Sequence, residues 1–480
     1  MLGTRRVSLA AGGAAIALLC TLASPVTASP KPALYFGPVP RAVCGPGSDP
    51  ETGIQGRVST ADVTSGRAAR GYRCNTVVLG HYGRIGSTGS AGGYRVYHYV
   101  DRHGHQCAFY DSTLLFPTNA TAPSTDLTGV YVLDMNDPSH PVHTASLVTP
   151  AMQSPHESLS LNVARGLLAA NLGNPVTYPG IVDVYDVSQD CRHPVLKSSG
   201  PQARFGHEGA FSPDGRTYWV ASPAGNLTAV DVGDPTNPSA VWSTTSMQPH
   251  GLNISDDGNT LYYADLGADP GLTILDVSQV QRRMPNPQVK VVSHITWDTV
   301  SIPQVPIPVT INHHPYLVEI DEFASSGHGS AGISSSSSAR VGAARIIDIA
   351  NPRHPRVISN IRLEVNMPKQ RALVANDPGA NSPLQGYAGH YCAVPQRAEP
   401  GIVACSFIQS GMRVFDIRDP LHPKEIAYFN APVHSSPGAD PGFNYAMSAP
   451  TFVPSRSEIW YADGNDGFYA LRVTNHVWPF

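Results

Sequence analysis

The sequence predicts an all-β fold, a seven-bladed β-propeller whose blades are four-stranded antiparallel sheets. Three observations support this prediction: a strand pattern that repeats along the chain, a hairpin pattern that alternates with it, and the composition. Of 480 residues, 44 are glycine and 44 are proline, and only 14% are charged, against about 25% in an average soluble domain. Many turn-forming residues and few charges favour short strands over long charged helices or a coiled coil.

The first pattern is an apolar run that ends in aspartate and is followed by a turn containing proline. Its six aspartates are Asp134, Asp186, Asp231, Asp276, Asp348 and Asp416. Their spacing is 45 to 72 residues, the length of one blade plus insertions. A seventh copy, at 468–473, lacks the aspartate. We expect each aspartate to accept a hydrogen bond from the backbone of the following turn.

The second pattern is a sixteen-residue strand–turn–strand stretch between successive copies of the first. The stretches are 156–171, 207–222, 250–265 and 448–463. Their turns include Asp214-Gly215 and Asp257-Gly258, and Asp-Gly between apolar runs is a strong hairpin signal. Together the two patterns predict four strands per unit, and such units are stable only when neighbours cover their faces, as in a ring.

The seventh unit reaches the end of the sequence after three strands, so we expect a strand from the N-terminal part to complete it. An open edge strand is costly, and we place the closing strand within 32–63, although a loose leader is the alternative. The predicted organisation is a signal peptide over 1–28, an extension over 29–71 and the propeller over 72–480.

The first 28 residues have the pattern of an export signal. Arg5 and Arg6 precede an uncharged apolar stretch at 10–22, and small residues end at Ala28. Residues 4–9 resemble a twin-arginine signal, so both this route and the general secretory route stay open. Since no later stretch approaches 18 apolar residues, we expect no membrane span and a secreted, extracellular or cell-envelope location.

Six cysteines follow the export signal, and we expect them to lie in an oxidising compartment. Cys392 and Cys405 flank a turn at 396–401, which predicts a disulfide across a hairpin. The sequence leaves the connectivity of the others open, and buried free thiols are the alternative: Cys44, Cys74, Cys107 and Cys191. The absence of Cys-x-x-Cys excludes a zinc ribbon or a thioredoxin-type site.

Four blades begin their first strand with a histidine, and the first strand of a blade lines the central channel. These residues are His156, His207, His250 and His390. Equivalent positions in a ring share a height and an inward direction, so the four imidazoles predict a site for one copper or iron ion.

Glu157 and Glu208 follow two of these histidines, and we expect their carboxylates to orient the imidazoles from behind. In the other three blades we place the equivalent positions at Tyr72, Pro306 and Ser448. The alternative is that these histidines bond a neighbouring blade and are structural. His313 and His314 fall in a turn, and His103 and His105 fall in an insertion of the first blade, where they could bind a metal, although their spacing is common in surface loops.

The aspartate-containing strands resemble the LVIVD-repeat family of secreted bacterial propellers, over roughly 72–480. This resemblance implies the fold and the exported location. The axial placement of four histidines is similar to that in carotenoid-cleaving oxygenases, which hold iron, and in selenium-binding-protein/methanethiol oxidases, which hold copper. The sequence carries no further signature of either enzyme family.

Charge and motifs exclude several functions. The chain has 32 Lys and Arg against 36 Asp and Glu and no basic run, which excludes an ordinary nucleic-acid binder. Gly-x-Ser-x-Gly, P-loop, dinucleotide-binding and HExxH motifs are absent.

Two functions stay open. One is an extracellular binding or scaffold module that takes a small molecule, protein or glycan on a rim of the propeller. The other is a copper- or iron-dependent oxidoreductase that uses the four histidines. In either case we expect a monomer.

Overall fold

The computed structural model describes residues 36–83, 92–112, 129–173, 176–327, 330–331, 340–378, 380, 386–433 and 444–479. They belong to one compact unit, Tyr35–Phe480; a second unit, Met1–Leu34, contains the predicted signal peptide and lies outside the described residues. In the described part of the chain, no helix has the length and apolar character needed to cross a membrane.

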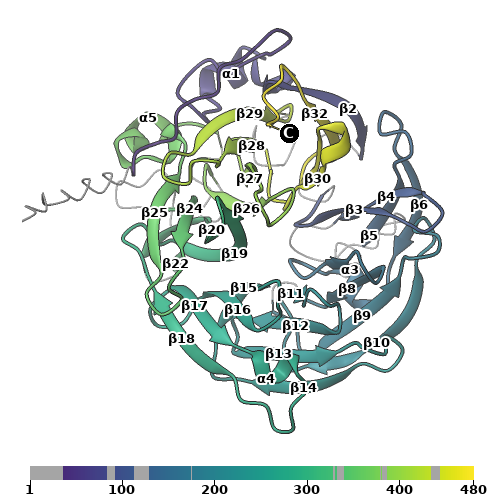
Figure 1. The fold of residues 1–480 in the computed structure, drawn as a ribbon. Coiled ribbons are helices and arrows are strands. Elements are labelled where there is room, and N and C mark those ends of the chain that lie inside the picture. The colour runs from purple at the N-terminus through teal and green to yellow at the C-terminus, as the bar shows by residue number, and fades with distance from the viewer. Residues whose placement is uncertain are drawn as a thin grey trace, which may run out of the picture. The chain divides into compact units, whose positions relative to one another are not determined.

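Seven antiparallel sheets form a ring of blades, which confirms the predicted fold (Figure 1). The strands of blade 1 are β3 (Val96–Val100), β4 (Gln106–Asp111), β5 (Val130–Asp134) and β6 (Val142–Leu147). Those of blade 2 are β7 (Ser160–Asn162), β8 (Leu167–Asn171), β9 (Gly180–Asp186) and β10 (Val195–Ala203). Those of blade 3 are β11 (Glu208–Phe211), β12 (Thr217–Ser222), β13 (Asn226–Asp231) and β14 (Ser239–Thr244).

The remaining blades follow the same order, from the axis outward. Blade 4 contains β15 (Pro249–Ile254), β16 (Thr260–Asp265), β17 (Gly271–Asp276) and β18 (Lys290–Ile295). Blade 5 contains β19 (Ile302–Ile311), β20 (His314–Glu322), β24 (Ala344–Asp348) and β25 (Arg356–Ile361). Blade 6 contains β26 (Gly389–Ala393), β27 (Ile402–Phe407), β28 (Gly411–Asp416) and β29 (Lys424–Asn430). Blade 7 contains β30 (Thr451–Val453), β31 (Glu458–Asp463) and β32 (Gly467–Val473).

The remaining described elements are short. A small sheet joins β21 (Ala324–Gly327), β22 (Ser330–Ala331) and β23 (Arg340–Val341). The helices are α1 (Thr60–Thr64), α3 (Pro150–Gln153), α4 (Ser278–Gln281) and α5 (Arg371–Val374). The 3₁₀ turns are η1 (Ala68–Arg70), η2 (Glu364–Asn366), η3 (Pro368–Gln370) and η4 (Pro454–Arg456).

Both faces of a blade pack against neighbouring blades, and this explains why the middle strands are apolar without alternation. All residues of β12 and of β31 are buried, as expected for strands covered on both sides. Trp219 and Trp460 are the largest fully buried side chains of these two strands. The core is therefore distributed between blades, and the channel is left for polar residues.

The ring is closed by a strand from the N-terminal part, but not by the segment expected. β2 (Thr76–Tyr82) pairs with β32, from Thr76 with Val473 to Tyr82 with Phe468. The placement of the closing strand within 32–63 is therefore wrong. The closing strand is the one that directly precedes blade 1 in the chain, because the first strand of blade 1 begins only at Val96.

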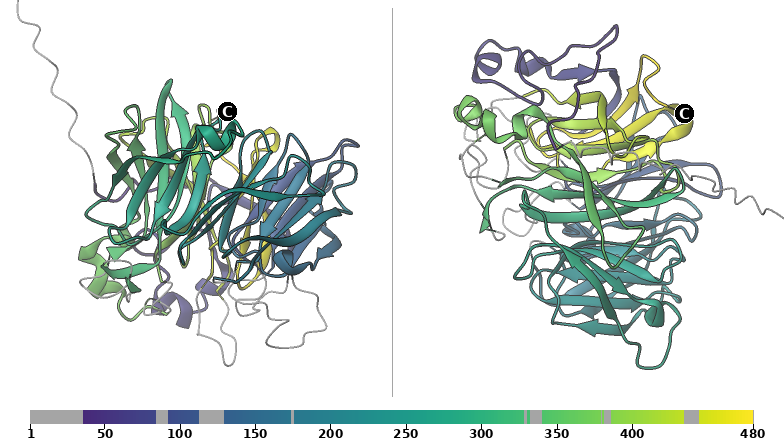
Figure 2. Two further views of the ribbon diagram at one scale, coloured as in Figure 1. Left: turned by 90° about the horizontal axis from the view of Figure 1, so that it is seen from below. Right: turned by 60° about the vertical axis from the view of Figure 1, so that its left-hand side comes forward.

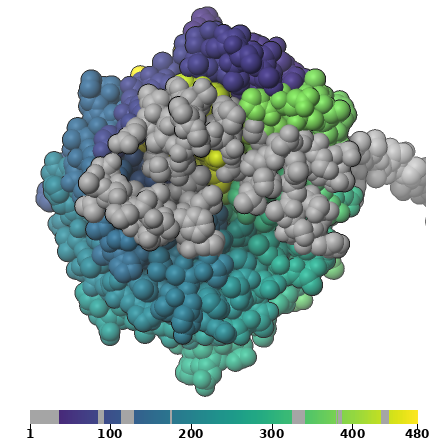
Figure 3. Space-filling model, turned by 180° about the vertical axis from the view of Figure 1, so that it is seen from behind, coloured from purple at the N-terminus to yellow at the C-terminus, as the bar shows by residue number. Residues whose placement is uncertain are grey.

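A second N-terminal strand extends blade 6. β1 (Tyr72–Cys74) pairs with β29 and makes this blade five-stranded. The N-terminal segment lies beside the C-terminal strands and at the edge of the ring (Figures 2 and 3). Residues 72–82 thus belong to blades 6 and 7, not to blade 1.

Three disulfides join the six described cysteines. Cys392 and Cys405 lie opposite each other on β26 and β27 with Cα atoms 4.0 Å apart, as the hairpin position predicts. The others are Cys44–Cys74 and Cys107–Cys191, so the alternative of buried free thiols is wrong. Three disulfides indicate an oxidising compartment.

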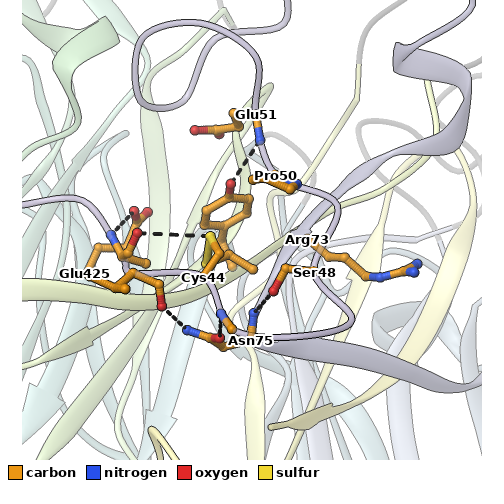
Figure 4. Close-up of a disulfide and its surroundings, with 12 residues drawn as sticks. Cys44, Ser48, Pro50, Glu51, Arg73, Asn75 and Glu425 are labelled. Atoms are coloured by element: carbon orange, nitrogen blue, oxygen red, sulfur yellow. Dashed lines mark hydrogen bonds between the residues drawn. A yellow bond between two sulfur atoms is a disulfide. The ribbon is translucent and has the colours of Figure 1, made fainter. Parts of the chain in front are cut away.

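The Cys44–Cys74 disulfide holds the N-terminal segment against blade 6 (Figure 4). Around it, the amide of Glu51 donates to the Tyr428 hydroxyl at 3.0 Å, and the amide of Ala42 donates to Glu425 at 3.2 Å. The extension over 36–71 is therefore anchored to the propeller.

Candidate metal centre

The four predicted histidines come from blades 2, 3, 4 and 6, at the start of each blade's innermost strand. His156 and His207 precede β7 and β11, whereas His250 and His390 are the second residues of β15 and β26. Each of these residues is buried, with at most 6% of its surface exposed. The sequence places them there because each blade begins its first strand at the same rim.

All four imidazoles converge on one carboxylate, that of Glu157. Its oxygens lie 3.9 Å from Nε2 of His156, 3.3 Å from Nε2 of His207, 3.4 Å from Nε2 of His250 and 3.5 Å from Nε2 of His390. The ring centroids of His156 and His207 are 4.5 Å apart, and those of His207 and His250 are 4.9 Å apart. The structure therefore brings the four histidines together at the axis.

Among its described residues, blade 5 has no histidine at this rim, but it contributes two other polar groups. Glu322, the last residue of β20, lies 3.5 Å from Nε2 of His250 and 3.1 Å from Nε2 of His390. The Gln304 amide donates a 2.6 Å hydrogen bond to Glu157. Glu322 was not identified from the sequence. The strand register could have indicated it. Glu322, at the end of β20, pairs with Ile302 at the start of β19, so it lies at the same rim as the histidines.

Two of the three positions assigned to the other blades need correction. In blade 1 the position belongs to Tyr94, whose ring lies 4.6 Å from that of His156 and 5.1 Å from that of His390. Tyr72 lies instead in β1, opposite Asn430 on the outer edge of blade 6. In blade 5 the residue that reaches the cluster is Gln304 rather than Pro306.

Backbone carbonyls, rather than carboxylates, orient two of the imidazoles. Nδ1 of His250 lies 2.8 Å from the Pro303 carbonyl, and Nδ1 of His390 lies 2.8 Å from the Met447 carbonyl. Because a carbonyl only accepts, Nδ1 carries the proton in both rings. When the ring is neutral, Nε2 therefore presents its lone pair to the axis.

The two predicted glutamates differ in role. Glu157 faces Nε2 of the histidines, on the side where an ion would bind, and not the rear of the rings. The Glu208 carboxylate forms an ion pair with Arg95 and accepts a 3.0 Å hydrogen bond from the amide of Leu252. Carbonyls of neighbouring blades occupy the place behind the His250 and His390 rings, and the expected role of Glu208 behind an imidazole stays a prediction.

The charges of the cluster are strongly coupled. Burial lowers the pKa of His156 well below its usual value. Burial also opposes the charged form of His250, but Glu322 and Glu157 outweigh it and raise the pKa of His250 to about 9. Burial would raise the pKa of Glu157, yet the facing imidazoles hold it well below its usual range. Glu157 and Glu322 thus favour the charged form of His250, whereas burial favours the neutral form of His156.

His156 has a left-handed backbone, with φ of 52°. This conformation is uncommon for a residue other than glycine and costs about 1–2 kcal/mol. Such strain persists only where surrounding structure imposes it. Here the α3 helix on one side and the Glu157–Glu208 bridge between blades on the other fix the chain that carries the ring.

The residues present fit a transition-metal ion. Two groups within the cluster place their donor atoms within 4.8 Å of one another: His156, Glu157 and His207, and Glu157, Glu322 and His390. Nε2 of His390 is buried and makes no hydrogen bond of good geometry in the described part of the chain. Imidazole with carboxylate is a donor set that copper and iron accept.

The other histidines singled out by the sequence lie away from this cluster. Asp101 accepts hydrogen bonds from the amides of His103, His105 and Cys191. With His105 and Asp190 it forms a further group whose donor atoms lie within 4.8 Å of one another. His313 lies in the turn between β19 and β20 with φ of 60°. His314 lies 2.9 Å from Asp348 on the same blade.

No family model and no curated protein matches this chain, so the resemblance to the LVIVD-repeat family stays a prediction. The periplasmic gluconolactonase of Pseudomonas aeruginosa is similar in structure, with 14% identity, 72% of this chain and 87% of that chain covered, and a TM-score of 0.46. Hydrazine synthase of Kuenenia stuttgartiensis matches with 14% identity, 80% and 97% coverage, and a TM-score of 0.47. The propeller domain of Cps50 (Swd1) from Myceliophteria thermophila matches with 11% identity, 79% and 97% coverage, and a TM-score of 0.48. Such distant similarity concerns the fold alone and carries no argument about activity.

Proposed function

We propose that this protein is an exported metalloprotein in which His156, His207, His250 and His390 hold one copper or iron ion for oxidoreductase chemistry. The observation that supports this proposal is the convergence of all four Nε2 atoms to within 3.9 Å of the Glu157 carboxylate. An exported protein meets copper readily, and the three disulfides agree with export by either the general secretory or the twin-arginine route.

A purely structural role explains only one side of the rings. Nδ1 of His250 and of His390 does bond a neighbouring blade, but the Nε2 side faces other imidazoles and carboxylates in a buried place. Burying ionisable groups without an ion that organises them is costly. A bound ion would receive the Nε2 lone pairs and offset that cost.

The chain's own residues have distinct tasks in this proposal. The imidazoles hold the ion, which when bound supplies one-electron chemistry. Gln304 fixes one oxygen of Glu157 by its hydrogen bond. Glu157 and Glu322 provide negative charge beside the ion, because each has an oxygen within 3.5 Å of Nε2 of His250 and of His390.

Metal analysis of the exported, purified chain tests the proposal. We expect a single copper or iron ion per chain, and we expect His390→Ala to lose it while near-UV circular dichroism shows that the propeller is kept. His422→Ala is the matched control, since His422 is exposed and contacts only Asp419 among described side chains. A wild-type chain that takes up neither ion, even after incubation with Cu(II) or Fe(II), would overturn the proposal.

The second candidate is an extracellular binding module that takes a small molecule, protein or glycan on the propeller. It is favoured by a pocket away from the axis, of about 800 Å³, on the outer parts of blades 4 and 5. Absence of metal together with ligand binding in this pocket would support this candidate over the first.

A further inference from the structure

A pocket of about 800 Å³ lies where the outer strands of blades 4 and 5 meet the chain that follows β25. Figure 1 shows β18, β25 and α5 on the same side of the ring. Its apolar lining includes Ile295, Trp297, Val341, Val357 and Met367. Its cationic lining is unusually rich for a chain with few charges: Arg340, Arg345, Arg356, Arg362 and Arg371.

Two of these arginines are neutralised by acids of blade 5. Arg345 is fully buried and forms ion pairs with Glu319 and Asp321. Arg356 pairs with Asp348 at 2.7 Å. Asp321 is further occupied by the Trp297 indole at 3.1 Å, so it has little capacity left for another cation.

Neither Arg362 nor Arg371 forms an ion pair with a carboxylate among the residues that the structure describes, although the charge of Asp321 acts on Arg362. Arg362 donates from Nη1 to the Val341 carbonyl at 2.9 Å, while its Nε and Nη2 have no partner there. Arg371 donates from Nη2 to the Asn366 carbonyl at 2.8 Å, while its Nε has no partner. Both residues are only 4% exposed.

The acids that flank the two arginines in the sequence are already paired. Glu364 forms an ion pair with Arg41 and Asp377 with Arg57, and 365–376 contains no aspartate or glutamate. The acid that lines the pocket, Asp298, is exposed. Two buried guanidinium groups without a direct ion pair are costly. The unused Nε and Nη2 of Arg362 form the planar fork that matches a carboxylate or phosphate, and Nε of Arg371 offers one further donor.

We propose that this pocket binds a small organic anion whose carboxylate or phosphate group pairs with Arg362 and Arg371. Its apolar part lies against Trp297 and Met367, which line the same pocket. The Arg345 guanidinium stacks on the Trp297 ring at 4.2 Å and so fixes the indole as one wall. Burial lowers the pKa of Arg362 to about 9 and that of Arg371 to about 10, so both are still cationic at neutral pH.

Isothermal titration of the full exported chain with benzoate, phenyl phosphate and inorganic phosphate tests the site. We expect one of the two aromatic anions to bind at least tenfold more tightly than inorganic phosphate, and the comparison of benzoate with phenyl phosphate distinguishes a carboxylate from a phosphate ligand. Failure of all three to bind at millimolar concentration, or equal binding of inorganic phosphate, would overturn the proposal.

Variants show whether Arg362 and Arg371 bind an anion or only support the fold. Arg362→Met and Arg371→Met should each lose at least tenfold in affinity, whereas Arg353→Met, an exposed arginine outside the pocket lining, should bind as the wild type. Without anion, Arg362→Met should unfold at the same or a higher temperature, because a buried unpaired charge is removed. If Arg362→Met unfolds at a lower temperature than the wild type and Arg371→Met keeps full affinity for the anion, the two arginines are structural and the proposal fails. The metal content of the axis plays no part in these measurements.

Discussion

The aspartate that ends the third strand of blades 1 to 6 closes the turn behind it. In each case Oδ1 accepts the amide N–H two residues further on, at 2.7 to 3.0 Å. Where the strand ends, this amide would otherwise lose its ladder partner. The recurrence of the residue therefore reflects backbone satisfaction, and it carries no chemistry.

His156 allows the strain of one residue to be separated from its role at the axis. Compared with the metal-free wild type, His156→Gly should raise the free energy of unfolding by about 1 kcal/mol, since glycine adopts a left-handed backbone without the cost that other residues bear. Urea denaturation measures this change. His207→Gly, at a position without positive φ in the described chain, is the control and should show no gain. Both variants should lose the bound ion, and a stabilised variant that keeps its metal would contradict the assignment of His156.

A buried aspartate in blade 7 predicts how stability depends on pH. Burial, with a further contribution from the charge of Asp466, raises the pKa of Asp463 to about 7. The folded protein thus binds this proton more tightly than the unfolded chain, whose aspartate titrates near 4. The stability that this bound proton contributes is fully present below about pH 4. This contribution is lost as the pH rises towards 7.

Asp463→Asn tests this dependence, because an amide resembles the protonated carboxyl and can still accept the Asn465 N–H. We expect the variant to melt above the wild type at pH 8 and close to it at pH 4, measured by circular dichroism. Parallel melting curves of the two proteins across this range would rule out the assignment.

At the scale of elements, the three disulfides close loops of very different length. The separations are 84 residues for Cys107–Cys191, 30 for Cys44–Cys74 and 13 for Cys392–Cys405. Only the last joins neighbouring strands of one hairpin; Cys107–Cys191 links blade 1 to the turn after β9 in blade 2. The long links therefore constrain the unfolded chain most.

Removing these pairs should destabilise the protein in order of loop length. Replacing Cys107 and Cys191 by alanine should cost about 1.5 kcal/mol more than replacing Cys392 and Cys405. Chemical denaturation of the two double variants under identical oxidising conditions measures the difference. The reverse order would show that contacts of the sulfur atoms, and not loop closure, dominate.

At the scale of the whole molecule, the ring is closed at one place, the seam where β2 pairs with β32. β2 supplies the outer strand of blade 7, and β1 adds to blade 6 just before it. The two ends of the propeller thus close each other, and β32 has no exposed edge where β2 covers it. Closure in this manner covers the edge of β32, which would otherwise offer its backbone groups to another chain, and gives blade 7 a fourth, outer strand like those of the other blades.

Truncation tests the seam. A chain that begins at residue 92 lacks β1 and β2, and we expect it to melt at a lower temperature and to elute as aggregates in size-exclusion chromatography. A chain that begins at residue 36 keeps both strands and is the control. If the shorter chain is monomeric and equally stable, blade 7 does not depend on β2.

The sequence predicted the blades well because each is a local pattern. Aspartate-ending strands and Asp-Gly hairpins are encoded within a few residues, and their recurrence required a ring in which neighbours cover one another. The rim histidines followed from the same repeat. One disulfide could be assigned for the same reason, since Cys392 and Cys405 lie on one hairpin.

Only the tertiary structure decided what depends on contacts between distant parts of the chain. The closing strand, the pairing of Cys44 with Cys74 and the place of Tyr94 all depend on where the N-terminal segment meets blades 6, 7 and 1. Glu322 reaches His250 and His390 because the strand register of blade 5 brings the end of β20 to this rim. Repetition in the sequence determines what each blade is, whereas the meeting of blades around the axis determines which side chains face one another.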